Sequence, residues 1–131
     1  MGKKVDDSVL DGALNEIKSN CDRMTLCEGE PATFAEANTD KGTGTNKKLA
    51  DVIMAAGDFT IANGDASGRK VTVGAKSAVD VDVTGTGDHV ALLDTVGSRL
   101  LYVTTTSAAV NVDAAGTVDI QTWDIEIADP S

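Results

Sequence analysis

The sequence predicts a mainly β protein, either an antiparallel β-sandwich or a small barrel of about seven short strands, with one N-terminal α-helix. Two observations carry this prediction. The spacing of apolar residues changes from a period near 3.6 to a period of 2 at about residue 22, and clusters of Gly, Asn, Asp and Thr separate the apolar runs that follow. No helical pattern lies between those runs, so the pattern excludes a parallel α/β sheet, which needs crossover connections.

The length of the chain predicts a single domain over residues 1–131. The composition, with 41% hydrophobic residues, is that of an ordinary soluble globule. A chain of this size buries about two-thirds of its unfolded surface on folding, which is enough for one hydrophobic core.

The first expected element is an amphipathic helix over about residues 7–19. Its apolar residues recur at the i, i+3, i+4 and i+7 spacing that places them on one helical face; they are Leu10, Ala13, Leu14 and Ile17. Asp6 or Asp7 can accept the free N–H groups of the first turn, and Asn20 is a suitable stop. Gly12 costs about 1 kcal/mol relative to Ala, so this helix needs tertiary contacts to persist.

The β domain is expected over about residues 22–129. Its first strand starts at Arg23, where Met24 and Leu26 alternate with more polar positions. Two later segments alternate valine with polar residues, which predicts strands with one buried and one solvated face. The valines are Val71, Val73, Val79, Val81 and Val83.

The second half of the β domain has a different pattern. Residues 89–94 and 99–105 are apolar on both faces, which predicts two central strands covered on both sides. The short, Gly-containing segment 95–98 predicts a hairpin between them. The last strand, over about residues 119–128, places its apolar side chains on one face; these are Trp123, Ile125 and Ile127.

The segment at about residues 35–48 is rich in turn formers and charges and has no large apolar residue. We expect a flexible surface loop there, because loops of this length are uncommon inside compact domains. Such loops are either binding segments or solvated excursions, and the second interpretation is the simpler one for this composition.

The charge balance argues against nucleic acid and membrane partners. The chain has 21 acidic and 11 basic residues, a net charge of -10, and only 3% aromatic residues. This charge repels phosphate, and few aromatic rings are present on which bases could stack. No apolar run reaches the roughly 18 residues that a membrane helix needs, and the start of the chain lacks the apolar core of a secretory signal.

Reactive groups follow no catalytic or ligand-binding pattern. The single histidine, His89, begins an apolar strand, and we expect it to be structural. The glycine pairs at residues 42–44 and 85–87 lack the features of a phosphate-binding loop. Calcium ligands were considered at Asp58, Asn63 and Asp65 and at Asp80 and Asp82, but this spacing fits no calcium loop. We therefore expect a non-enzymatic protein without cofactor or metal.

The two cysteines, Cys21 and Cys27, lie six residues apart. A structural zinc site needs about four ligands, and only one histidine accompanies them. Three interpretations stay open: buried free thiols, an internal disulfide closing a small loop, or a covalent link to a neighbouring subunit after exposure to oxidising conditions.

Six stretches of the chain resemble a known family. They are residues 3–14 (KKVDDSVLDGAL), 21–37 (CDRMTLCEGEPATFAEA), 65–73 (DASGRKVTV), 87–94 (GDHVALLD), 99–105 (RLLYVTT) and 123–130 (WDIEIADP). Together they resemble the small virion structural proteins of tailed bacteriophages and prophages. The resemblance covers nearly the whole chain, and among virion roles it is most similar to a capsid (head) decoration or cement protein.

This resemblance implies a protein that is made in the host bacterial cytoplasm, binds the outer surface of the assembled capsid and braces the joints between major capsid protein subunits. It also implies a homo-oligomer, a dimer or a trimer. Many modest contacts on a repeated lattice can stabilise a capsid, because multivalency raises effective concentration and binding to the mature lattice stabilises it by mass action.

The expected interface residues lie on the helix and in the last strand: Leu10, Leu14, Ile17 and Trp123. The strand edges at residues 23–27 and 123–128 could extend a neighbour's sheet. The alternative for the helix is packing under its own sheet. Two other functions compete: a tail, neck or fibre component of the virion, and a carbohydrate-binding or hydrolytic β domain, which the shortage of aromatic platforms disfavours.

Overall fold

The structure is a computed structural model that describes residues 2–131, and it is mainly β with antiparallel sheets and one long N-terminal helix. The predicted fold class is therefore confirmed. The elements in chain order are α1 (Asp7–Asn20), β1 (Arg23–Cys27), α2 (Phe34–Asn38), β2 (Lys48–Ile53), η1 (Ala56–Asp58), β3 (Phe59–Asn63), β4 (Arg69–Val73), β5 (Lys76–Asp80), β6 (Gly85–Asp94), β7 (Arg99–Val112), β8 (Thr117–Ile120) and β9 (Trp123–Ile127).

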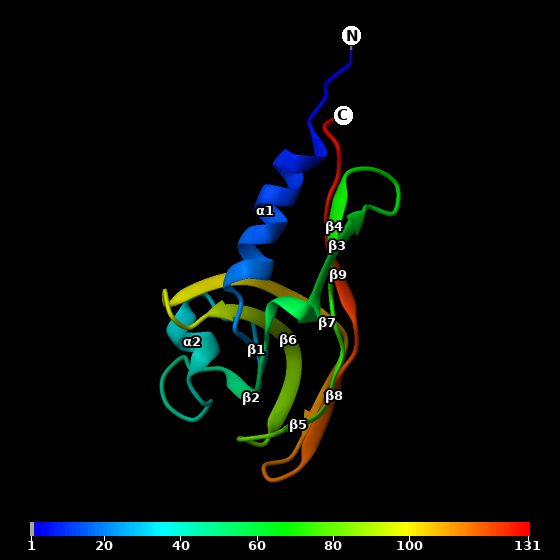
Figure 1. The fold of residues 1–131 in the computed structure, drawn as a ribbon. Helices are drawn as coiled ribbons and strands as arrows, with labels where there is room; N and C mark the ends of the chain where they lie inside the picture. Colours follow the sequence, from blue (N-terminus) through cyan, green and yellow to red (C-terminus); the bar gives the residue numbers. More distant parts are fainter. Residues whose placement is uncertain (1) are drawn as a thin grey trace.

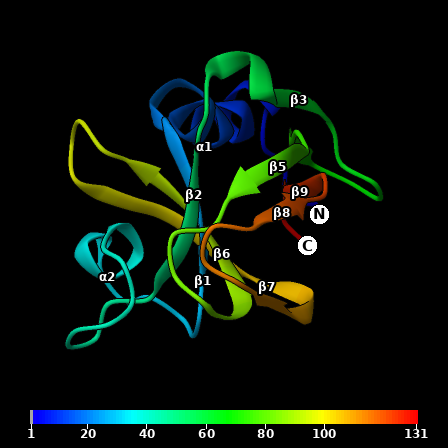
Figure 2. The same ribbon diagram turned by 90° about the horizontal axis from the view of Figure 1, so that it is seen from below.

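Six strands curve around the wider part of the molecule, which we call the body (Figures 1 and 2). Four of them form a sheet in the order β2-β1-β6-β7, and β5 pairs with β8. An isolated bridge between Ala50 and Val81 joins these two sheets, and the Leu49 carbonyl accepts hydrogen bonds from the N–H groups of Asp82 and Val83. The strands thus follow one another as β7-β6-β1-β2-β5-β8, and the series is open between β7 and β8.

The remaining strands and α1 form a narrower extension, the projecting lobe, whose tip holds both chain ends (Figure 1). Its sheet has the order β3-β4-β9, and α1 lies against one face of it. The Asp6 side chain caps α1 by accepting from the Ser8 N–H at 2.8 Å, as the sequence predicts. The apolar stripe of α1 points at the sheet, so Leu10, Leu14 and Ile17 are buried while Ala13 stays exposed.

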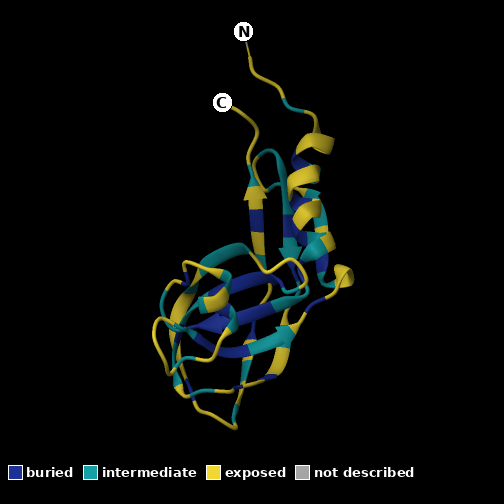
Figure 3. Cartoon of the chain, turned by 90° about the vertical axis from the view of Figure 1, so that its left-hand side faces the viewer, coloured by how far each residue is buried: buried dark blue, intermediate teal, exposed yellow. Residues whose placement is uncertain are grey.

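One continuous hydrophobic core runs through both parts, from Leu14 and Phe59 in the projecting lobe to Leu26 and Leu92 in the body. A second, smaller cluster lies on the other face of the body sheet, and it contains Cys27, Ala37, Ala91 and Leu93. Strand β6 is therefore covered on both faces, as its sequence predicts, and Figure 3 shows buried residues in the middle of the body.

The prediction of a flexible surface loop over residues 35–48 is wrong in its first part. Helix α2 begins there, with Thr33 capping it through a hydrogen bond to the Glu36 N–H. Ala37 is fully buried because it packs between β1 and β6 in the second cluster. The end of the segment is also ordered, since Lys48 is buried and starts β2. Residues 41–47 do form an exposed turn region.

The strand count and two strand assignments also need correction. Nine strands form instead of about seven. The segment at 119–128 is two strands, because β8 ends at Ile120, β9 begins at Trp123, and the two belong to different sheets. Strand β7 lies at the edge of its sheet and not in the centre, although the hairpin that joins it to β6 is present as expected.

Candidate functional site

The helix residues expected at an interface lie inside the chain's own core. Leu10, Leu14 and Ile17 face the projecting lobe's sheet, with exposed fractions between 1% and 9%. A contact through these side chains would require α1 to leave the sheet. The helix instead presents Val9 to solvent, with 63% of its surface exposed. The outer face of α1 is exposed along its length in Figure 3.

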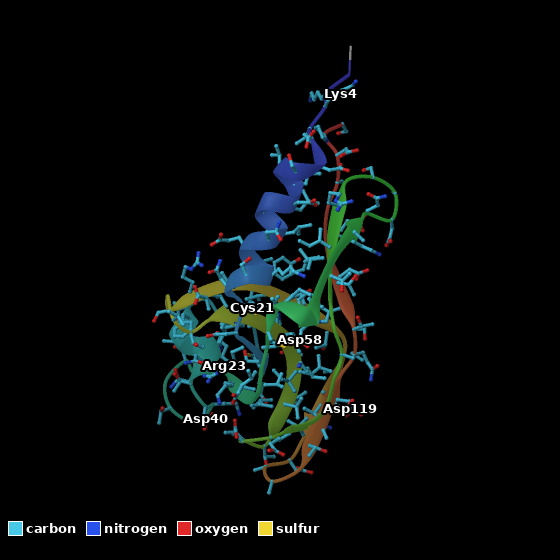
Figure 4. The ribbon with its side chains drawn as sticks, viewed as in Figure 1. Lys4, Cys21, Arg23, Asp40, Asp58 and Asp119 are labelled. Carbon is cyan, nitrogen blue, oxygen red and sulfur yellow. The ribbon has the colours of Figure 1, made fainter. Side chains whose placement is uncertain are left out.

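The two thiols are free and buried, and they belong to different clusters. Cys21 lies at the junction of α1 and the body, in the main core (Figure 4). Cys27 belongs to the second cluster, on the other face of the body sheet. Burial raises the pKa of Cys21 to about 11 and also raises the pKa of Cys27, so both sulfurs are held as unreactive thiols at neutral pH.

A cavity lies where the series of body strands is open. It has a volume of about 530 Å³. Leu26 and Val90 supply apolar side chains to it, residues 104–108 with Val110 line it from β7, and residues 118–124 line it from β8 and β9. Thr, Ser and Gln side chains are also among the lining residues, so the cleft combines a mainly apolar lining with some hydrogen-bonding groups.

Trp123 is the one expected interface residue that reaches this cleft. Its ring stacks on Tyr102 of β7, with the ring centroids 5.9 Å apart and the planes at 29°. Its indole Nε1 is buried and has no hydrogen-bond partner among the residues that the structure describes. A buried donor without an acceptor costs free energy, so this group is an unfavourable feature of the cleft wall.

A cluster of one lysine and three aspartates links neighbouring segments of the body near β2. Lys48 Nζ lies 2.8 Å from Asp40 Oδ1, 2.7 Å from Asp51 Oδ1 and 3.0 Å from Asp82 Oδ2. Burial by itself lowers the pKa of Lys48, but the hydrogen bonds from these three carboxylates outweigh burial and raise it above its usual range. One lysine thereby joins the loop after α2, the strand β2 and the turn after β5, which is a structural role.

The single histidine is tied to its neighbour. His89 Nδ1 lies 2.8 Å from Asp88 Oδ1, and the same oxygen accepts the Gly29 N–H at 2.7 Å. These two hydrogen bonds, with the contact from His89 first, hold the pKa of the Asp88 carboxyl below its usual value. The arrangement joins the start of β6 to the turn after β1, and no nucleophile lies in it.

Three of the four aspartates that the sequence offers as calcium ligands pair with lysines, and one of them, Asp82, lies 3.0 Å from Lys48 Nζ. Asp58 lies 2.9 Å from Lys76 Nζ, and Asp65 lies 2.8 Å from Lys70 Nζ. Within residues 2–131, no group of three or more His, Cys, Asp or Glu side chains is arranged to hold a metal ion. Over the same residues, no helix has the length and apolar character needed to cross a membrane.

Sequence reasoning missed the contribution of β7 to the cleft. The signal was present, because residues 100–112 form a run of thirteen without a charged side chain, in a chain with 24% charged residues. The pattern predicts a central strand over residues 99–105 only, whereas β7 continues to Val112 and its residues 105 and 107–111 are exposed.

Comparison with known proteins identifies no relative of the chain. No family model matches the chain, and no curated protein or solved structure matches it at a significant level.

Proposed function

We propose that this chain is a structural protein of a phage virion that binds the outside of the assembled capsid and stabilises it. The observation that supports the proposal most directly is that the six stretches of family resemblance form the framework of both parts of the molecule. They contain β1, β4 and β9, most of α2 and β6, and the first half of α1 and of β7. The proposed partner is the major capsid protein, the proposed location is the virion exterior, and the proposed assembly is a homo-oligomer.

The surfaces of the molecule suit such a role. Exposed contact area is offered by the outer face of α1 in the projecting lobe and by the cleft in the body. Some ionisable groups next to these surfaces are held in ion pairs, as Arg69 is with Asp11 at 2.7 Å. A repeated lattice needs only modest contacts of this kind, because each additional neighbour raises the effective concentration of the next contact.

The test is binding to capsids that lack the protein. Purified chain is mixed with such capsids, co-sedimentation is measured, and the added density is located by electron microscopy. We expect density on the capsid lattice and a higher temperature of genome release. Density at the tail or neck would favour the alternative of a tail, neck or fibre component, and failure to bind either would overturn the virion role.

A matched pair of variants examines the helix surface in the same assay. Val9→Asp and Asn15→Asp each add one negative charge to an exposed position of α1. If α1 contacts the shell through its exposed apolar residue, Val9→Asp weakens binding while Asn15→Asp does not. This pair avoids deletion of the helix, which would remove Leu14 and Ile17 from the core.

A further inference from the structure

The free edges of the sheets differ in how they are protected. A strand at a sheet edge exposes unpaired N–H and C=O groups, and natural proteins usually blunt such edges with charged side chains, bulges or covering segments. Strand β9 carries Asp124 and Glu126, and β8 carries Asp119. At β3, the Lys18 ammonium donates to the Phe59 carbonyl at 2.7 Å.

After Arg99, the first half of β7 has no charged side chain, and its one interruption is a bulge at Leu101, because Leu92 pairs with Tyr102 while Leu93 pairs with Leu100. Residues 100–105 (LLYVTT) contain no charge, no Pro and no Gly. They pair with β6 on one side, and no backbone hydrogen bond joins them to any other part of residues 2–131. Six residues of high β-propensity without charge are the sequence type that pairs readily with another strand.

The surroundings of this edge leave room for an added strand. The cleft of about 530 Å³ is lined by Thr104 and Thr105, and across it lie residues 118–124. A large bulge limits the pairing edge at its far end, because Thr105 pairs with His89 while Val110 pairs with Gly87. At the near end stands Arg99, which is held by Asp94 and Glu16. The open edge thus lies between Arg99 and the large bulge, and the smaller bulge at Leu101 leaves residues 102–105 as its regular part.

We infer that this edge, residues 100–105 of β7, pairs antiparallel with the same edge of a second copy of the chain about a two-fold axis. Each copy carries a net charge of -10, so copies repel one another wherever acidic surfaces meet. The edge itself brings no carboxylate to the contact, and the acidic groups in the lining of the neighbouring cleft are Asp119 and Asp124. An isologous contact of this kind joins the two four-stranded sheets into one, and closes after two copies.

This inference rests on the proposed function, because it specifies which surface forms the homo-oligomer. The dimer is nevertheless measured in solution, without capsids. The failure of one can therefore be told from the failure of the other. The variant is Thr105→Lys, and the matched control is Thr60→Lys. Both threonines are exposed and lie on edge strands, and both substitutions change the net charge by the same amount.

Sedimentation velocity over a range of concentrations gives the mass in solution. We expect wild type and Thr60→Lys at twice the 13.4 kDa mass of the chain. Thr105→Lys should weaken the dimer by about tenfold or more, which corresponds to about 1.4 kcal/mol. A wild type that stays monomeric at its highest soluble concentration overturns the inference, and so does a Thr105→Lys variant that dimerises like wild type.

Amide hydrogen exchange of the wild type supplies a second measurement that does not depend on the folding of a variant. Amides within residues 100–105 should gain protection as the protein concentration rises, whereas amides of β3 should not. Absence of this gain overturns the inference. If the wild type is monomeric and Thr105→Lys loses capsid binding, self-pairing is overturned and the edge is assigned to a strand of the shell protein.

Discussion

The body and the projecting lobe use their sheets differently. In the projecting lobe, one face of the sheet packs on α1 through Val71, Val73 and Ile125, and the other face carries the ion pairs of Lys70. In the body, β6 is buried on both faces, by the main core on one side and by the second cluster under α2 on the other.

This difference shows that the body sheet has apolar contacts on two faces, whereas the sheet of the projecting lobe has them on one. A sheet with one covered face has a single layer of apolar contacts, so its stability depends on the element that covers it. Removing α1 would leave Phe59 and Val71 open to water, whereas no single element covers both faces of β6. The projecting lobe should therefore open locally at a lower free energy than the body does.

The largest expected effect comes from truncating the body core. Leu92 is fully buried in β6, between strands that cannot move independently, so Leu92→Ala should lower the free energy of unfolding by about 4 kcal/mol. Leu14 is equally buried, but it lies on a helix that can shift to fill part of the cavity, so Leu14→Ala should cost about 3 kcal/mol. Urea denaturation gives both values.

Hydrogen exchange of the same two variants tests the comparison itself. Leu14→Ala should speed exchange mainly in β3, β4 and β9, while Leu92→Ala should speed it across the whole chain. If both variants speed hydrogen exchange equally in the body and in the projecting lobe, the two parts unfold as one unit. The expected difference in their local stability would then be contradicted.

The second effect concerns the charged cluster of the body. Replacing Lys48 by Met leaves three carboxylates facing one another without a cation. The expected loss is about 2 kcal/mol, less than for a fully buried pair because Asp40 and Asp82 are partly exposed and remain solvated. The matched control is Lys3→Met at an exposed position in the chain before α1, which should change the denaturation midpoint little.

Most of the architecture could be predicted from the sequence because its apolar patterns are strong. The helix stripe, the alternation around Val71 and the doubly apolar run of β6 each indicate their own burial. Strand β7 has the same doubly apolar pattern as β6 but lies at an edge, because position within a sheet is set by topology and not by local composition. In β7 the uncharged residues therefore lie on a strand that has a neighbouring strand on one side only.

The remaining errors have local physical causes. Helix α2 has five residues and buries one alanine, so it carries too little apolar periodicity to be recognised beside so many turn formers. The division between β8 and β9 falls at Gln121 and Thr122, neither of which is a strong strand breaker. The cleft brings together Leu26, Val90 and residues between 104 and 124, which are distant in the sequence, and no sequence motif indicates that they meet.

The third effect is the dependence of stability on pH. Burial raises the pKa of Asp51, but Lys48 outweighs burial and lowers it, and the pKa of Asp88 is also lowered. These carboxylates contribute stability above the unfolded pKa of about 3.9 and lose it as the pH falls through their folded values. The raised pKa of Lys48 has the opposite sign: its contribution is complete below the unfolded pKa of about 10.4 and is lost as the pH rises further.

Urea midpoints should therefore stay nearly constant between about pH 5 and about pH 9, and fall on both sides of that range. Asp51→Asn should reduce the acid decline, since the substituted group no longer titrates. A stability maximum in strongly acidic solution would contradict the assignment of these carboxylates as stabilising partners.

The smallest expected effect is a gain in the projecting lobe, and it uses two glycines. Gly12 is exposed on α1, an added Cβ would meet nothing within 4 Å, and its backbone is helical, so Gly12→Ala should stabilise the chain by about 0.7 kcal/mol. Gly68 is the matched control in the hairpin between β3 and β4. There φ is +71° and an added Cβ would collide with the Ile127 carbonyl, so Gly68→Ala should destabilise. Thermal unfolding followed by circular dichroism measures the stability of both variants. Because the sheet of the projecting lobe is covered on one face only, by α1, Gly12→Ala should also slow hydrogen exchange in β3, β4 and β9 more than in the body. A Gly12→Ala variant that is less stable than wild type would show that this face of α1 makes a contact that the single chain does not contain.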